Sequence, residues 1–358
     1  MIILDKCLII LDGYFEIDYK IKRKVIDSVD SVSTFDEFAL KTSKLFDEYI
    51  KDFDIKKYLK YFNEKFYNKL IESYNKSNVT VITENCEDYP QRLYNIQDRP
   101  ICLYYTGDIS LLQNNKVLSI VGSRKTLPNV LKITEEYSYE LAKNGVTIVT
   151  GVAGGGDLAA IKGAIKTNKI VSVIASGMDN TFREYNRDYI EKIKNVGLVI
   201  GEYPPSVVAQ PYHYPIRNRI IAGLSDATLI VSGDYKSGTR YTLNYALDFG
   251  RDVFAFPYNI GVASGELCNQ VIKDGGYIVT ELNDITEILG IDIDSKQKVE
   301  LSSSEELVLS AIKSGKTNVD DILLETGLKI FEVMPALTSL EIKNLLVKNS
   351  ASEYSLIK

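Results

Sequence analysis

The sequence of 358 residues contains no tryptophan, one histidine and four cysteines. The cysteines lie far apart and form no CxxC pair: they are Cys7, Cys86, Cys102 and Cys268. A structural zinc site takes four ligands, and His213 is the sole imidazole, so we expect no metal site. Nothing in the sequence predicts another cofactor. We interpret the cysteines as reduced, buried thiols of a cytoplasmic protein.

The chain also lacks long apolar runs and an excess of positive charge. No run approaches the roughly 18 residues that a membrane-spanning helix needs, so we expect no membrane association. Asp5 and Lys6 interrupt the apolar start, and no small-residue cleavage site follows, so we expect no signal peptide. The 42 Lys and Arg residues are outnumbered by 48 Asp and Glu, a net charge of −6. This balance argues against coating of duplex DNA by charge alone, so any polyanion site must be local.

The composition, 45% hydrophobic and 25% charged, is ordinary for a globular protein with a sizeable core. The length suits two or three domains. Apolar residues at helical spacing predict a small helical domain over residues 1–75. Short apolar runs broken by Pro90 and Pro100 then predict a connecting segment, with one strand near Val79–Thr83.

From Lys116 onward, predicted strands and helices alternate, which indicates a parallel sheet with crossover helices. The apolar runs are continuous, as in strands buried on both faces. The predicted strands are Val117–Val121, Val146–Thr150, Ile170–Ala175, Leu198–Ile200, Ala227–Val231, Val253–Phe256 and Tyr277–Val279. The predicted helices are Val130–Asn144, Leu158–Lys166, Asn186–Lys194, Ile216–Leu224, Thr239–Phe249 and Glu266–Lys273. The fold class predicted for residues 79–290 is therefore α/β, with a Rossmann-like, mostly parallel sheet.

The C-terminal part of the chain has a different organisation. An acidic, serine-rich stretch over residues 291–304 predicts a linker, and residues 305–358 predict a winged-helix domain of three helices and a hairpin. These elements are Glu306–Lys313, Val319–Thr326, Ile330–Leu340, Leu345–Val347 and Tyr354–Ile357. Winged-helix domains bind DNA or partner proteins. The third helix carries Glu332 and almost no cations, so the sequence leaves both roles open.

Three glycine-containing turns follow predicted strands, at the sheet edge where open α/β folds bind ligands. In the first turn, Gly122 lets the backbone approach a ligand, and Ser123 and Thr126 offer hydroxyl groups. The guanidinium of Arg124 can bind a phosphate through two parallel N–H bonds. An ordinary turn with a surface arginine is the alternative.

The second turn contains three consecutive glycines, Gly154, Gly155 and Gly156, where a helix N-terminus presents free N–H groups to an anion. No Lys-Ser or Lys-Thr follows, so the turn is not a P-loop. Its spacing also departs from GxGxxG, which disfavours NAD binding although Asp179 follows the next strand.

The third turn repeats the combination of cation, hydroxyl and glycine in Lys236, Ser237 and Gly238. A fourth segment places three polar residues at the start of a helix, namely Arg217, Asn218 and Arg219. These arginines bind phosphates or, alternatively, cap the helix and form salt bridges. The four segments supply phosphate-binding groups but no recognisable catalytic apparatus, since His213 is best explained by loop packing.

With these motifs in place, residues 79–290 resemble the DNA-processing protein A family, also called the Smf family. The resemblance rests on the order and spacing of eight segments. They are Gly122–Arg124, Thr150–Asp157, Ser176–Asp179, Glu202–Pro205, Arg217–Ser225, Lys236–Gly238, Gly265–Asn269 and Asp274–Gly275. The flanks agree, because many members carry an N-terminal helical SAM-like domain and a C-terminal winged helix.

The resemblance implies a cytoplasmic, non-catalytic homodimer that binds and protects incoming single-stranded DNA. Such proteins help to load the RecA recombinase during natural transformation. By position, the resemblance assigns phosphate contacts to Arg124, Arg217, Arg219 and Lys236. It assigns the shape of the pocket to Ser123, Gly155, Asn218, Ser237 and Gly238.

The chain departs from the family pattern at several positions. Gly154 stands where the family usually has arginine, and Ile161 stands where it has histidine. Arg183 replaces a tyrosine, and we expect its cation to compensate in part for the one missing at Gly154. The sequence therefore predicts a divergent member of the family.

Two other functions remain open at this stage. One is a nucleotide phosphoribohydrolase on a related Rossmann-like fold, although the glutamate of that enzyme motif is missing from the segment Lys236–Leu243. The other is a nucleotide sensor that signals through the winged helix.

Overall fold

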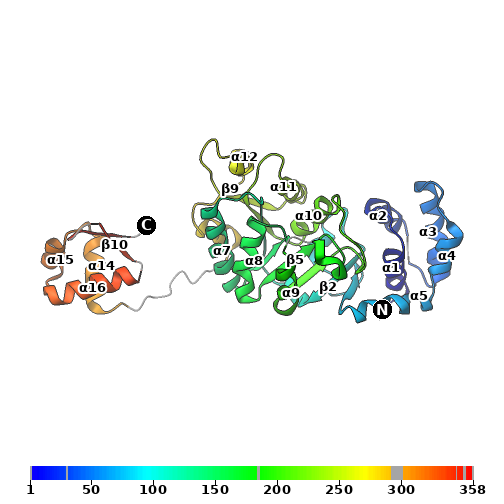
Figure 1. Cartoon of the computed structure of the whole chain (residues 1–358), viewed down its shortest axis with the longest axis horizontal. Helices are drawn as coiled ribbons and strands as arrows, with labels where there is room; N and C mark the ends of the chain where they lie inside the picture. The colour runs from blue at the N-terminus through cyan, green and yellow to red at the C-terminus, as the bar shows by residue number, and fades with distance from the viewer. Residues whose placement is uncertain are drawn as a thin grey trace. The chain divides into compact units, whose positions relative to one another are not determined.

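The computed structural model describes residues 2–29, 31–183, 186–291, 301–343, 345–349 and 352–356. The chain forms two compact units, Met1–Ile293 and Asp294–Lys358 (Figure 1). Most of the predicted linker over residues 291–304 lies outside the described residues.

The first unit begins with five helices in the stretch that was predicted to be helical. They are α1 (Ile3–Tyr14), α2 (Tyr19–Asp27), α3 (Phe35–Tyr49), α4 (Ile55–Tyr61) and α5 (Glu64–Lys76). Side chains at four N-caps accept bonds from backbone N–H groups, which fixes where these helices start. The capping residues are Asp18, Thr34, Asp54 and Asn63. An aromatic cluster around Tyr58, with Phe15 and Phe62, fills the space between the helices.

A nine-stranded sheet forms the centre of the unit, in the order β1-β2-β6-β5-β4-β3-β7-β8-β9. The strands from β3 to β9 pair in parallel, as predicted. Their bounds are β3 (Val117–Gly122), β4 (Thr147–Thr150), β5 (Ile170–Ile174), β6 (Leu198–Gly201), β7 (Ala227–Ser232), β8 (Asp252–Ala255) and β9 (Tyr277–Ile278).

The segment predicted as a connection also contributes strands to this sheet. β1 (Thr80–Thr83) and β2 (Cys102–Gly107) pair with each other, and β2 pairs antiparallel with β6. The prediction missed β2 because its apolar run is set between Pro100 and Gly107, residues typical of connections. A short helix, α6 (Gln91–Tyr94), lies between the two strands in the chain.

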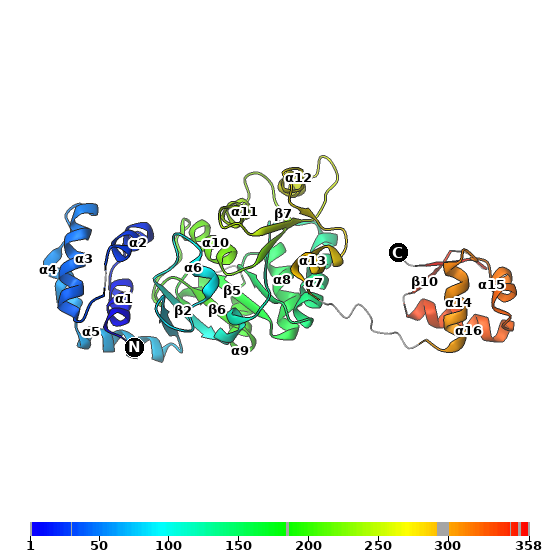
Figure 2. The ribbon, with the colours of Figure 1, turned by 180° about the vertical axis from the view of Figure 1, so that it is seen from behind.

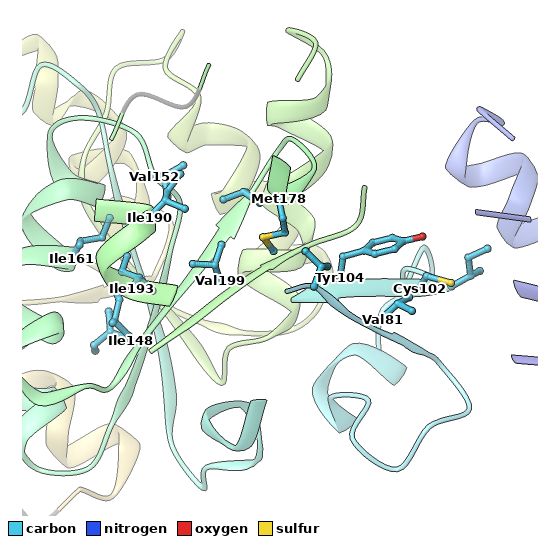
Figure 3. Close-up of a cluster of buried hydrophobic side chains, with 14 of the residues drawn as sticks. Val81, Cys102, Tyr104, Ile148, Val152, Ile161, Met178, Ile190, Ile193 and Val199 are labelled. Carbon is cyan, nitrogen blue, oxygen red and sulfur yellow. The ribbon is translucent and has the colours of Figure 1, made fainter. Parts of the chain in front are cut away.

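Helices cover both faces of the sheet, because the strand side chains point alternately to the two sides. On one face, apolar residues of α7 (Pro128–Lys143), α8 (Gly156–Ala164), α9 (Arg187–Val196) and α13 (Asn283–Leu289) pack on the strands. Figure 3 shows Ile161, Ile190 and Ile193 of these helices beside Ile148 and Val199 of the sheet.

The opposite face carries α10 (His213–Gly223), α11 (Thr239–Asp248) and α12 (Glu266–Lys273), together with α6 (Figure 2). Along β3, Leu118 and Ile120 belong to the first layer, and Val117 and Val121 belong to the second. Both faces are therefore buried, which explains the continuous apolar runs in the sequence.

The strand order places a topological switch at β3. From β3 the chain adds β4, β5 and β6 on one side, and then returns to place β7 on the other side. The connections that follow β3 and β7 therefore run in opposite directions from neighbouring strand ends. Open α/β sheets bind ligands at this position.

The second unit contains α14 (Ser303–Lys313), α15 (Val319–Thr326) and α16 (Ile330–Ile342), followed by the antiparallel strands β10 (Leu346–Lys348) and β11 (Tyr354–Leu356). A capping box between Ser302 and Glu305 starts α14, and Gly327 ends α15 with a φ of 68°. The unit has its own apolar core, which includes Ile322 and Leu337. The order of elements agrees with the expected helices and hairpin, and the winged-helix assignment stays a prediction.

Candidate functional site

Three loops meet at the carboxyl ends of β4, β3 and β7: residues 122–127 (the β3 loop), 151–155 (the β4 loop) and 233–238 (the β7 loop). The N–H of Ser123 lies 2.9 Å from Oγ of Ser232 and 3.2 Å from its carbonyl oxygen, which ties the β3 loop to the end of β7. The N–H of Gly156 donates to the carbonyl of Ser123 at 3.3 Å. The structure thus brings together the three turns that the sequence singled out.

Glycines allow the β3 and β4 loops to pack backbone against backbone. Gly155 has a φ of 75° and a ψ of −126°, and a Cβ there would lie 2.0 Å from the carbonyl oxygen of Ser123. A Cβ on Gly156 would lie 2.6 Å from Cα of Gly122. Gly154 is buried in the same turn. Part of the glycine signal in the sequence therefore reflects loop packing.

Hydroxyl groups connect the β3 loop internally. Thr126 is buried, and its Oγ1 donates to the carbonyl of Ser123 at 2.6 Å and is hydrogen-bonded to Ser232. Oγ of Ser123 accepts from the N–H of Lys125 at 3.1 Å. Thr126 thus stabilises the loop, and half-buried Ser123 remains at its surface.

Asp157 is hydrogen-bonded to both the β3 loop and the β4 loop. Its Oδ1 accepts the N–H of Gly122 at 3.2 Å, and the N–H of Ala153 also donates to the carboxylate. Burial raises the pKa of Asp157 above its ordinary value, and the positive charge of Arg217 opposes that rise. The carboxylate of Asp157 is therefore part of the loop scaffold.

Arg217 lies under the β4 loop. It is buried, and its guanidinium donates to the carbonyl of Val173 and, through Nε, to Oδ1 of Asn218 at 3.1 Å. A Cβ on Gly151 would lie 2.9 Å from Nη2 of Arg217. Nδ2 of Asn218 donates to the carbonyl of Gly238 at 3.3 Å. Arg217 and Asn218 therefore belong to the site as supports of the β4 and β7 loops.

Arg219 is not brought to these loops. Its side chain is 1% exposed and forms an ion pair with Glu202 in which Nη2 and Oε1 are 2.5 Å apart. Nε donates to the carbonyl of Asp98, and the guanidinium lies 4.5 Å from the centre of the Tyr19 ring. Burial lowers the pKa of Arg219, but Glu202 outweighs this and holds the pKa above its ordinary value. Arg219 is a buried structural cation, and we remove it from the candidate site.

The exposed cations of the edge lie on the β3 loop and around the β7 loop. Arg124 and Lys125 are exposed on the former, and Lys236 and Arg240 on the latter and the start of α11. Lys125 and Arg240 were absent from the predicted set, although both belong to the segments that predicted the site. The side chain of Arg183 lies outside the described residues.

The β7 loop also contains a buried hydroxyl group. The N–H of Lys236 donates to Oδ1 of Asp234 at 2.8 Å, which folds the loop into a tight turn. Within the described residues, the buried Oγ of Ser237 has no hydrogen-bond partner. Gly238 is exposed, and a Cβ there would meet nothing within 4 Å. The loop thus leaves an open approach at Gly238, next to the exposed lysine, and keeps the Ser237 hydroxyl inside.

Elsewhere in the described part of the chain, no group of three or more His, Cys, Asp or Glu side chains is arranged to hold a metal ion. None of the described helices is long and apolar enough to cross a membrane. Cys7, Cys102 and Cys268 are buried and Cys86 is half-buried, and none of the four forms a disulfide.

The chain is thus an α/β protein with a Rossmann-like sheet, and glycine-containing loops and exposed cations lie at the switch point of that sheet. The family model described as DNA recombination-mediator protein A matches residues 80–290, and the chain belongs to this family. The predicted resemblance is confirmed.

Among curated relatives, the Synechocystis protein Smf is 28% identical over 327 residues, which cover 80% of this chain and 82% of the relative. The DNA processing protein DprA of Bacillus subtilis is 32% identical over 232 residues, covering 63% of this chain and 77% of the relative. The chain is thus a relative of DNA-processing proteins.

Two solved structures share the fold. The DNA processing protein A of Streptococcus pneumoniae matches 78% of this chain and 95% of that chain, with a TM-score of 0.65 and 26% identity. The DNA processing protein A of Helicobacter pylori matches 59% of this chain and 95% of that chain, with a TM-score of 0.54 and 27% identity. The Helicobacter pylori structure addresses how that protein binds single-stranded DNA.

Proposed function

We propose that this chain binds single-stranded DNA along the carboxyl edge of its sheet, and that the β3, β4 and β7 loops contact the phosphates. The observation that carries this proposal is the exposure of Arg124, Lys125, Lys236 and Arg240 around one switch point, on a chain with a net charge of −6. Cations spread over several loops suit successive phosphates of one strand. The single-stranded DNA binding of the Helicobacter pylori relative supports the same ligand.

Aromatic residues beside the cations favour a single strand over a duplex. Tyr235 and Tyr241 flank Lys236 and Arg240 in the chain, and their side chains are 48% and 50% exposed. Exposed tyrosine rings stack on unpaired bases, whereas the bases of a duplex are already stacked on one another. The acidic net charge further weakens non-specific duplex binding.

In this role the chain is a non-catalytic, cytoplasmic mediator that protects a strand and passes it to the RecA recombinase. We further propose that it works as a homodimer. β9 ends the sheet with an unpaired edge, and Tyr277 and Ile278 on that strand are exposed. Exposed apolar strand edges pair readily with a second chain, so this end of the sheet is our candidate for the dimer contact.

Our first prediction concerns the cations. Binding of labelled oligo-dT, followed by fluorescence anisotropy at several salt concentrations, should weaken roughly tenfold or more in the double variant Arg124→Gln, Lys236→Gln. The slope of log affinity against log salt should fall by about 0.7 for each phosphate that the variant no longer neutralises. Both residues are exposed, so we expect the fold to be unchanged.

A control is available at the other end of β3. Lys116 directly precedes β3, so Lys116→Gln removes a positive charge at the opposite edge of the sheet. This variant should bind oligo-dT like the wild type. Equal affinity and salt slope in the double variant and the control would contradict the proposed interface.

A further inference from the structure

A cavity of about 820 Å³ lies within the first unit, at the start of α10. One wall is the turn between α1 and α2, including Tyr14, Glu16 and Tyr19. The opposite wall is the connection from β6 to α10, including Tyr203 and Tyr212. The volume is within the range of small-ligand sites, and the phosphate loops do not line it.

Aromatic rings form one side of this cavity. The Tyr203 ring stacks on His213, with ring centres 4.1 Å apart and an angle of 15° between the planes. Tyr212 stands perpendicular to His213 at 4.5 Å, and its side chain is 62% exposed. The packed rings of Tyr203 and His213 therefore hold the exposed Tyr212 ring at the cavity. Tyr212 can stack there with a planar ligand.

The charged groups of the cavity disfavour a phosphate. Four carboxylates and two cations line it: Asp12, Glu16, Asp18, Glu202, Lys22 and Arg99. Lys22 is paired with Asp12 at 2.6 Å, and Arg99 with Glu84 at 2.7 Å, so both cations are already neutralised. The surplus of carboxylates attracts groups that donate N–H bonds.

Glu16 is the carboxylate best placed to bind such a donor. Glu202 is committed to Arg219, Asp12 to Lys22, and Asp18 caps α2 by accepting the N–H of Lys20 at 2.9 Å. Glu16 is exposed and lies close enough to interact electrostatically with His213 on the opposite wall. A ligand that stacks on the aromatic wall can thus donate a hydrogen bond to Glu16.

Helix α10 connects the cavity to the proposed DNA interface. His213 lines the cavity, and Arg217 supports the β4 loop four residues later. Four residues of helix correspond to about 6 Å, or one turn. A strand lying on the phosphate loops is therefore within reach of the cavity.

We propose that this cavity receives one base of the bound strand and prefers bases that carry an exocyclic amino group over thymine. This inference rests on the proposed single-stranded DNA binding. Tyr212 provides the stacking surface, and the Glu16 carboxylate accepts a bond from the amino group of cytosine, adenine or guanine. Thymine has no amino group: its one ring donor, N3–H, is flanked by the O2 and O4 carbonyls, which repel the carboxylate.

The test compares three strands of equal length and equal phosphate number: oligo-dC, oligo-dT and a fully abasic oligonucleotide. With the full-length protein, we expect oligo-dC to bind roughly tenfold more tightly than oligo-dT, because the N4 amino group of cytosine donates to the carboxylate, whereas the N3–H of thymine lies between two carbonyl oxygens that repel it. Glu16→Ala should bring the ratio of the two affinities close to one. Tyr212→Ala should weaken both base-bearing strands by roughly tenfold and leave the abasic strand unchanged.

The control is Tyr49→Ala, which removes another exposed tyrosine, on α3, that does not line the cavity. It should leave all three affinities unchanged. Salt-sensitive binding of all strands with no effect of Glu16→Ala or Tyr212→Ala would overturn the cavity assignment and leave the proposed function in place. Failure of every strand to bind the wild type would overturn both.

Discussion

Arg217 and Arg219 stand two residues apart on α10 and act in different parts of the fold. Arg217 donates to Val173 and lies beside Gly151, so its charge supports the β4 loop. Arg219 is paired with Glu202 and covered by the Tyr19 ring. A sequence shows that two cations are near a helix start, but it does not show which buried carboxylate each one meets. The partner of each arginine is decided by the fold, because the end of β6 and the N-terminal helices come to α10 from distant parts of the chain.

A side chain at Gly155 would disrupt the packing of the β4 loop against the β3 loop. Gly155→Ala places a Cβ 2.0 Å from the carbonyl oxygen of Ser123, in a backbone conformation that favours glycine. The backbone cannot accept this contact without moving the β3 loop. We expect a loss of at least ~2 kcal/mol in the free energy of unfolding and weaker oligo-dT binding. Urea unfolding and anisotropy measure the two effects.

The variant Gly250→Ala separates the cost of a left-handed backbone conformation from the cost of a steric clash. Gly250 also has a positive φ, 64°, but a Cβ there would meet nothing within 4 Å. We therefore expect a cost of about 1 kcal/mol for the backbone conformation alone, with oligo-dT binding unchanged. Equal stability losses in the two alanine variants would show that the contact between the β3 and β4 loops is unimportant.

Among the elements, the parallel strands were the easiest to predict. Continuous apolar runs such as Val117–Val121 mark strands covered on both faces, and their positions agree with β3 to β9 within one or two residues. β2 was harder, because Cys102–Gly107 follows Pro100 in a segment rich in turn residues and its partner β6 lies about 95 residues later in the chain. The four predicted segments do reach one edge. Which of their side chains face solvent depends on loop packing that no local pattern encodes.

The capping box of α14 gives a prediction that depends on pH. Glu305 accepts bonds from Lys343 Nζ at 2.7 Å and from the N–H of Ser302 at 2.6 Å. These bonds, that from Lys343 most of all, lower the pKa of Glu305 from 4.5 to about 2. The folded-state pKa is depressed, so the stabilisation is present at neutral pH and is lost as the pH falls from about 4.5 to about 2.

This loss can be followed by urea unfolding of the second unit at several pH values, observed through NMR signals of α14. Glu305→Gln should be less stable than the wild type at pH 7, because the amide cannot replace the charged acceptor. Its stability should also change less across the same pH window. A wild-type profile without this decline would contradict the assigned bonds.

For the whole molecule, the prediction is a transfer of DNA to RecA. On a strand coated with a single-stranded DNA-binding protein, we expect the chain to shorten the lag before RecA hydrolyses ATP. The double variant Arg124→Gln, Lys236→Gln should lose this effect, and Lys116→Gln should retain it. A lag that the wild-type chain leaves unchanged would contradict the RecA role while leaving the DNA affinity measurable.

The N-terminal helices were predicted as a separate domain, but they share buried polar contacts with the sheet. Arg23 pairs with Glu84 at 2.7 Å, and Tyr104 donates to Asp12 at 2.9 Å. Thr83 donates to Asp5 at 2.5 Å. These contacts place the helices and the sheet in one unit.

A chain shortened to begin near residue 79 would keep every strand of the sheet and still be damaged. Glu84 would lose Arg23, and the guanidinium of Arg219 would lose the Tyr19 ring that covers it. Exposing a buried ion pair to water changes its geometry, and α10 holds both Arg219 and the Arg217 that supports the β4 loop. The N-terminal helices thus cover buried charged residues, and their removal would alter the proposed DNA-binding edge through α10.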